Sequence, residues 1–94
     1  MSETVAIKRL IIRKLVNSTV WGHKHTPLDF VTKSLPGHFR MRPAGQRAIE
    51  KALKELRNER WIILLRKRTG RGYDWHVSLN PEKNAEIQTF LVDS

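Results

Sequence analysis

The sequence predicts an α+β fold, and three observations indicate it. Apolar residues recur at helical spacing through most of residues 3–59, as in helices that bury one side. A β-rich run with a glycine-containing turn follows in residues 61–79 and is typical of a β-hairpin. Asn80-Pro81 then supplies a capping residue and a proline at the first helical position. We therefore expect three helices, a hairpin and a closing helix.

The chain has 94 residues, which suits one compact domain with its own core. We expect this domain to span 1–94, with the core in about 3–80 and the closing helix in about 81–92. Cysteine is absent, which excludes disulfides and thiolate metal sites. The N-terminal stretch carries charges among its apolar residues and does not resemble a signal peptide. No window holds the uncharged apolar run that a membrane span needs.

The first helix is expected at residues 3–17. Its apolar residues wrap wider than one stripe, which indicates a helix that packs on two sides. These residues are Val5, Ile7, Leu10, Ile11, Ile12, Leu15 and Val16. The pattern then breaks, and Gly22 and the residues around it favour a short extended piece through His25.

The second helix is expected to be brief and to begin at Thr26-Pro27. Thr26 can cap it, Pro27 suits its first position, and Asp29 lies near the positive end of the helix dipole. The apolar stripe consists of Leu28, Val31 and Leu35. Pro36-Gly37 ends the helix, and a connector follows.

The third helix has the clearest pattern and is expected at 44–59, with Pro43 opening it. Its apolar face consists of Ile49, Ala52, Leu53 and Leu56. At about 100° per residue, the opposite face is polar. That face consists of Arg47, Lys51, Lys54 and Asn58, with Glu50 at its flank.

In the hairpin, Thr69-Gly70-Arg71-Gly72 is expected to form the turn, with both glycines free to adopt positive φ. The second strand alternates apolar Tyr73, Trp75, Val77 and Leu79 with polar residues. We expect Trp61 and Trp75 to face the helices, and Tyr73 to be the most exposed aromatic residue. The closing helix carries an apolar seam of Ile87, Phe90 and Leu91, which either docks on the first helix or forms a dimer interface.

The formal net charge is +9, and it is concentrated in one part of the chain. Residues 40–71 hold eleven of the 18 Lys and Arg but only three of the nine Asp and Glu. Such a field favours phosphate backbones or acidic protein surfaces. Two explanations of this charge need no ligand. Glu55 and Glu59 could pair with cations of the same helix, and the Arg66-Lys67-Arg68 run could serve only to protect a sheet edge from pairing with another chain.

In its order of elements the chain resembles the winged helix-turn-helix superfamily, over roughly Glu3 to Asn80. The segment that carries the likeness is TPLDFVTKSLPGHFRMRPAGQRAIEKALKELRNERWIILLRKRTGRGYDWHVSLN. It is most similar to small basic archaeal winged-helix proteins. The resemblance implies a three-helix core, a C-terminal β-hairpin wing and an extra C-terminal helix. The connector at 36–43 is longer than the tight turn of the simplest helix-turn-helix, so the angle between its two helices is open.

The resemblance also implies double-stranded DNA binding, with a recognition helix at about 44–59 and a basic wing at 66–72. The nucleic-acid-binding residues would be Arg40, Arg42, Gln46, Arg47, Glu50, Lys51, Lys54, Arg66, Lys67, Arg68 and Arg71. Arg47 could read guanine and Gln46 adenine. Lys51 and Lys54 suit phosphate contacts, which position the protein without reading sequence.

The other constellations carry little chemistry. His23 and His25 would share a face, with His38 and His76 as partners, but no cysteine or paired carboxylate completes a metal site. No serine lies in a nucleophile elbow, and the turn lacks the Gly-Lys-Ser/Thr of a phosphate loop. We therefore expect no catalytic residue, no metal, no cofactor and no enzyme activity.

The expected partner is nucleic acid, with duplex DNA first, and not a membrane. The protein would be a transcription regulator or chromatin-associated factor of the cytoplasm, nucleoid-associated if it binds DNA. It would act as a monomer, or as a homodimer through the C-terminal helix. Two alternatives stay open: an RNA- or ribosome-binding protein, and a protein–protein interaction module with an acidic partner.

Overall fold

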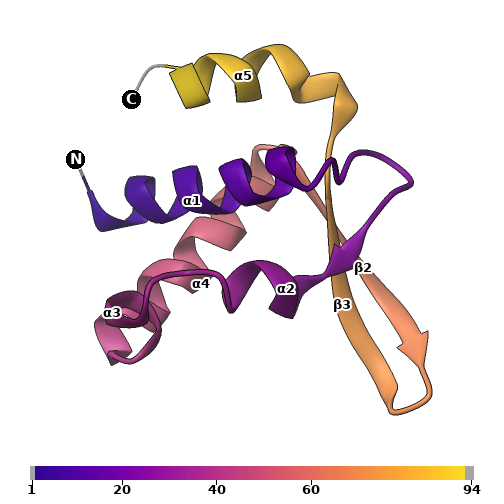
Figure 1. The fold of residues 1–94 in the computed structure, drawn as a ribbon, viewed down its shortest axis with the longest axis horizontal. Helices are drawn as coiled ribbons and strands as arrows, with labels where there is room; N and C mark the ends of the chain where they lie inside the picture. Colours follow the sequence, from indigo (N-terminus) through magenta and orange to yellow (C-terminus); the bar gives the residue numbers. More distant parts are fainter. Residues whose placement is uncertain (1, 93–94) are drawn as a thin grey trace.

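The computed structural model describes residues 2–92, which form five α-helices and a three-stranded antiparallel sheet, so the α+β class is confirmed. The elements in order are α1 (Glu3–Asn17), β1 (Thr26–Pro27), α2 (Leu28–Thr32), α3 (Gly37–Arg40), α4 (Pro43–Asn58), β2 (Ile62–Thr69), β3 (Gly72–Leu79), the 3₁₀ turn η1 (Pro81–Lys83) and α5 (Asn84–Val92). Figure 1 shows α1 between α5 and α2, with the β2–β3 hairpin projecting beyond the helices. Within this described part, no helix is both long enough and apolar enough to cross a membrane.

The core forms around α1, which packs on α4, α2, α5 and β3. This explains the wide apolar surface of its sequence, although Leu10 remains 38% exposed. The fully buried apolar side chains are Ile7, Ile11, Ile12, Leu15, Val31, Ala52, Leu56, Val77, Leu79 and Ile87. Every layer of the fold therefore contributes to one cluster.

The second helix begins later than the sequence predicted. Thr26 does not cap it; Thr26 and Pro27 form β1 and pair with Val77 and His76 of β3. Pro27 is the N-cap of α2, and no side chain there accepts a backbone hydrogen bond. Sheet pairing thus takes the two residues that a capping motif alone would assign to the helix.

The connector between the second and third predicted helices is not irregular, because it contains α3. Pro36 precedes this single turn, and Phe39 on it is buried. Gly45 of α4 packs directly on α3: an added Cβ would lie 2.6 Å from both Cα and the carbonyl carbon of Phe39. Real Cβ atoms essentially never approach so closely, so this contact requires glycine. The contact brings α4 close to α3, the helical turn that the connector contains.

α4 follows its prediction closely. Pro43 occupies the first turn, and the helix ends at Asn58. Arg60 then adopts a positive φ of 63°, and the chain reverses into β2. The predicted apolar face is confirmed: Ile49, Ala52 and Leu56 are buried, and Leu53 packs against them.

The hairpin has the predicted turn, with Thr69 paired to Gly72. Of the two glycines in the turn, only Gly72 adopts a positive φ, of 119°. Near the helices the predicted alternation holds only in part, because Val77 and Leu79 are buried as expected but Ser78 between them is buried too. The burial prediction fails farther out. Trp75 is 51% exposed because the hairpin extends beyond the helices that would cover it (Figure 1).

The C-terminal helix docks on the first one. Asn80 accepts a hydrogen bond from the Glu82 backbone, as the capping motif predicted. Ile87 is fully buried, and the Phe90 ring packs edge-on against Trp61. Arg9 Nη1 donates to the Phe90 carbonyl at 2.6 Å. The apolar seam is therefore packed within the chain, and partly buried Trp61 faces it rather than solvent.

Candidate nucleic-acid interface

The outer face of α4 is a row of exposed polar side chains. Arg47, Glu50, Lys51 and Lys54 all lie on it, as the helical pattern predicted. They are exposed because burial of the opposite face on α1 directs them outward. An exposed row on a 16-residue helix is the geometry that major-groove contact requires.

The residues at the start of α4 are held by local hydrogen bonds. Gln46 Nε2 donates to the Arg40 carbonyl at 2.8 Å, and Arg42 Nε donates to the His38 carbonyl at 2.9 Å. Gln46 is thus engaged in bracing α4 against α3, although it remains exposed. Bidentate pairing with adenine would require this amide to turn away from Arg40.

Glu55 of α4 and Glu59 just after it form ion pairs with α1 and not with the cations of α4. Lys8 Nζ lies 2.6 Å from Glu55 Oε1 and 3.4 Å from Glu59 Oε1. The hydrogen bond from Lys8 lowers the pKa of Glu55. Burial by itself lowers the pKa of Lys8, but the hydrogen bond to Glu55 and the two carboxylate charges outweigh it and raise that pKa overall.

This pairing leaves the basic segment without compensation. Among residues 2–92, none of the eleven Lys and Arg of residues 40–71 lies within 4.0 Å of a carboxylate oxygen. Glu55 and Glu59 therefore form no contact ion pair with a cation of α4, although the charge of Lys51 also contributes, after Lys8, to the lowered pKa of Glu55. Uncompensated, exposed cations retain their field toward solvent, where a polyanion could meet it.

Strand alternation divides the basic run of the hairpin between two faces. Arg66 and Arg68 lie on the same face as Trp75 and Tyr73, with which they pair, and Lys67 lies on the other, opposite Asp74. The Arg66 guanidinium carbon lies 4.7 Å from the centre of the Tyr73 ring. Arg71 lies in the two-residue turn and is exposed. A ligand that wraps the hairpin could reach all four cations, whereas a flat one reaches only some.

The two basic elements meet at one junction. β2 begins soon after α4 ends, and α4 packs on β2. Figure 1 shows α4 and the hairpin diverging from this junction, with α2 between them. The covalent link and the packing fix the hairpin relative to the row on α4.

The histidines do not form a metal site. Among residues 2–92, no group of three or more His, Cys, Asp or Glu side chains is arranged to hold a metal. His25 and His76 do meet, with Nδ1 atoms 2.8 Å apart and rings edge-on. One ring must donate and the other accept, so at least one imidazole is neutral in this contact. The pair joins the segment before β1 to β3.

We expect the protein to lose stability as pH falls from 7.5 to 5.5. Burial, then the charges of Lys67 and His76, lower the pKa of His25 below 6.5. The unfolded chain therefore binds more protons, so stability is present above pH 6.5 and declines as pH falls through the folded-state pKa. Urea midpoints at the two pH values measure this. His76→Gln should flatten the dependence, and His23→Gln, at an exposed residue, should retain it; equal slopes in both variants would contradict the assignment.

Comparison with known proteins adds no relative: no family model, no curated protein and no solved structure matches the chain. The functional reading accordingly depends on the geometry and charge of the residues described above.

Proposed function

We propose that this protein binds double-stranded DNA as a winged-helix protein, with α4 as the recognition helix and the β2–β3 hairpin as the wing. The observation that supports this most is the set of eleven uncompensated cations on and around two elements that pack together. The sheet order β1-β3-β2 and the exposed row on α4 also suit this reading.

In this proposal α4 enters the major groove and the wing follows the backbone. Arg47, near the start of α4, reads guanine through its planar fork. Lys51 and Lys54 contact phosphates as point charges. Arg66, Arg68 and Arg71 contact the backbone or the minor groove beside the wing. The protein would serve as a transcription regulator or chromatin-associated factor, at the nucleoid, with a monomer as its binding unit because α5 packs on α1.

A salt titration tests the proposal directly. Binding to 20-base-pair duplex DNA and duplex RNA is measured by fluorescence anisotropy between about 50 and 300 mM salt. We expect tighter binding to DNA, with log Kd rising linearly with log salt, because released counterions drive association. A helix does not fit the deep major groove of double-stranded RNA. Tighter binding to the RNA duplex would therefore favour the alternative function, an RNA- or ribosome-binding protein. Absence of binding to either duplex at 50 mM would favour an acidic protein partner.

We expect Arg47→Ala to reduce sequence preference more than overall affinity. With a site enriched from a randomised duplex pool, the variant should lose about 5- to 150-fold in affinity, the equivalent of 1–3 kcal/mol for one bidentate pair. Affinity for unrelated DNA should fall by much less. Lys54→Ala is the matched control on the same face and should weaken both DNAs about equally. If Arg47→Ala lost equal affinity for the selected site and for unrelated DNA, Arg47 would have no role in reading bases.

A further inference from the structure

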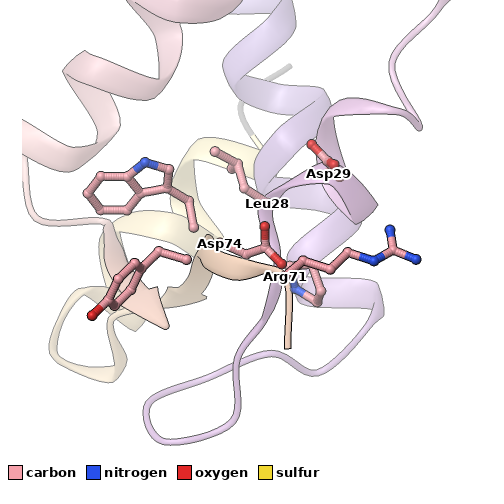
Figure 2. A pocket seen from close by; sticks show the side chains of 7 residues that line it. Leu28, Asp29, Arg71 and Asp74 are labelled. Atoms are coloured by element: carbon pink, nitrogen blue, oxygen red, sulfur yellow. The ribbon is translucent and has the colours of Figure 1, made fainter. Parts of the chain in front are cut away.

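A cavity of about 350 Å³ lies between the start of α2 and the outer half of the hairpin. Leu28 and Asp29 line it from α2, and Tyr73, Asp74 and Trp75 line it from β3. Figure 2 shows Leu28 and Asp29 on the α2 side and Asp74 and Arg71 on the hairpin side. Its size is near the lower end of the range for small-molecule sites, which suits one planar ring system.

The backbone edge of β3 faces this cavity. Leu79 N–H donates to the Val20 carbonyl and Leu79 C=O accepts from Gly22, so both groups point away from β2. Alternate residues of a strand direct these groups to the same side, so those of Trp75 and Tyr73 do likewise. β1 ends at Pro27, opposite His76. Within residues 2–92 no strand pairs with Trp75 or Tyr73 on that side.

The cavity combines three kinds of contact. Trp75 offers a half-exposed ring, whereas one face of Tyr73 is already occupied by Arg66. Asp74 forms no ion pair with a described residue, and Asp29 lies 4.0 Å from Lys33 with both side chains exposed, which is a weak contact. Arg71 adds a cation beside these acceptors. A ring, carboxylate acceptors and a guanidinium match a base, its exocyclic amino group and its phosphate.

We propose that this cavity holds one unpaired nucleobase bearing an amino group, taken from nucleic acid bound along the hairpin. The base stacks on Trp75 at the free edge of β3 and donates its amino hydrogens to Asp29, or around that edge to Asp74, whose side chain leaves the opposite face of the strand. Adenine, cytosine and guanine carry such amino donors, whereas thymine has no amino group and its single N3–H lies between two carbonyl oxygens that a carboxylate repels. The inference rests on the proposed function and specifies its ligand: a duplex that contains an extrahelical base.

An extrahelical base is the suitable ligand because a paired base is held inside its stack. Extrusion from an intact duplex costs a few kcal/mol, and it costs least where the base is already unpaired. Stacking on an aromatic side chain contributes about 1–3 kcal/mol per base. A peptide strand could also pair with the free edge of β3, but four cations in the hairpin favour a ligand that carries phosphates.

The test compares four labelled duplexes of otherwise identical sequence by fluorescence anisotropy at 100 mM salt. One is fully paired, and the others contain a single bulged adenine, a single bulged thymine or a single abasic bulge. The abasic duplex controls for bending at the bulge. We expect the adenine bulge to bind about 5- to 150-fold more tightly than the abasic bulge, the equivalent of the stacking energy above. The thymine bulge can also stack on Trp75 but has no amino group to donate, so it should bind more tightly than the abasic bulge and less tightly than the adenine bulge.

Three variants test whether the higher affinity for the adenine bulge comes from the cavity. Trp75→Ala should bring adenine-bulge affinity down to that of the abasic bulge while affinity for the paired duplex stays within about twofold. Trp75→Phe retains a ring and should recover part of the gain. Asp74→Asn should reduce the adenine-over-thymine preference. Thermal unfolding of each variant confirms that the hairpin still folds, since Trp75 is half-exposed and packs on little.

Two results would overturn the inference, and they differ in what they leave standing. Equal affinity for the adenine and abasic bulges, with the paired duplex still bound, would exclude a base in the cavity and keep the proposed function. No binding to any of the four duplexes, even at 50 mM salt, would remove the proposed function together with the inference.

Discussion

Gly45→Ala is expected to destabilise the protein by about 3 kcal/mol, the upper part of the range for overpacked sites. The added methyl group would overlap the carbonyl oxygen of Phe39 and lie 2.6 Å from its Cα and carbonyl carbon, and backbone cannot yield as the end of a flexible side chain does. Helix propensity alone would favour alanine by up to about 1 kcal/mol, so the sign of the change tests the contact itself. Urea unfolding followed by circular dichroism measures it.

Gly37→Ala is the matched control, because Gly37 begins α3 and an added Cβ would meet nothing within 4 Å. This variant should be neutral or slightly stabilised. If Gly45→Ala were equally neutral, α3 would have to shift away from α4 without cost, and the close helix contact would not determine their angle. Under the proposed function, a destabilised but folded Gly45→Ala should also bind DNA more weakly, since its packing of α3 against α4 is disturbed.

The triple variant Arg66→Ala, Arg68→Ala, Arg71→Ala is expected to lose about 100-fold or more in affinity for duplex DNA at 100 mM salt. Each cation that neutralises a phosphate contributes about 0.9 to the slope of log affinity against log salt, so the slope should fall by about three units. Anisotropy titrations at four or more salt concentrations give both quantities. A smaller change in slope would mean that the hairpin contacts fewer phosphates.

The control for this variant removes the same charge from elsewhere. Arg13→Ala, Lys33→Ala, Lys83→Ala takes three cations from outside residues 40–71 and lowers the formal net charge equally, from +9 to +6. We expect it to lose less than about threefold in affinity and to retain its salt slope. Equal losses in the two triple variants would show that overall charge, and not the hairpin, accounts for binding.

Much of the fold could be predicted because local patterns and tertiary packing agree there. The apolar faces of α1 and α4 determine which side of each helix is buried, and Pro43 and Asn80 begin their elements where cap rules place them. The turn between β2 and β3 also follows from its residues. In each case the residues within one turn or one strand contain the information.

The rest depended on contacts distant in sequence. Trp75 follows the apolar alternation of its strand, yet it is exposed because the helices end before it. Thr26 satisfies a capping rule but pairs with Val77, 51 residues later. Gly45 is only a weak helix former in the first turn of a predicted helix until Phe39 is placed against it. Periodicity indicates which side of an element is apolar, but not how far its neighbours extend.

For the candidate site, the sequence predicts where the charge is concentrated but not how the charged side chains are arranged in space. The sequence located the excess in residues 40–71, and the helical period gave the outward row on α4. The ion pair between Glu55 and Lys8 could not be predicted, because it depends on how α1 packs on α4. The cavity beside Trp75 required both the early end of β1 and the length of the hairpin.

The attachment of Lys8 to Glu55 and Glu59 has a consequence for kinetics. It holds two negative charges at the end of α4 on the side that faces α1, while Arg47, Lys51 and Lys54 stay on the opposite side with the single acid Glu50. The helix thus has an electric moment across its axis as well as along it. Under the proposed function, the protein would rotate into alignment before contact, which raises the rate of association, and added salt would slow arrival as well as weaken the complex.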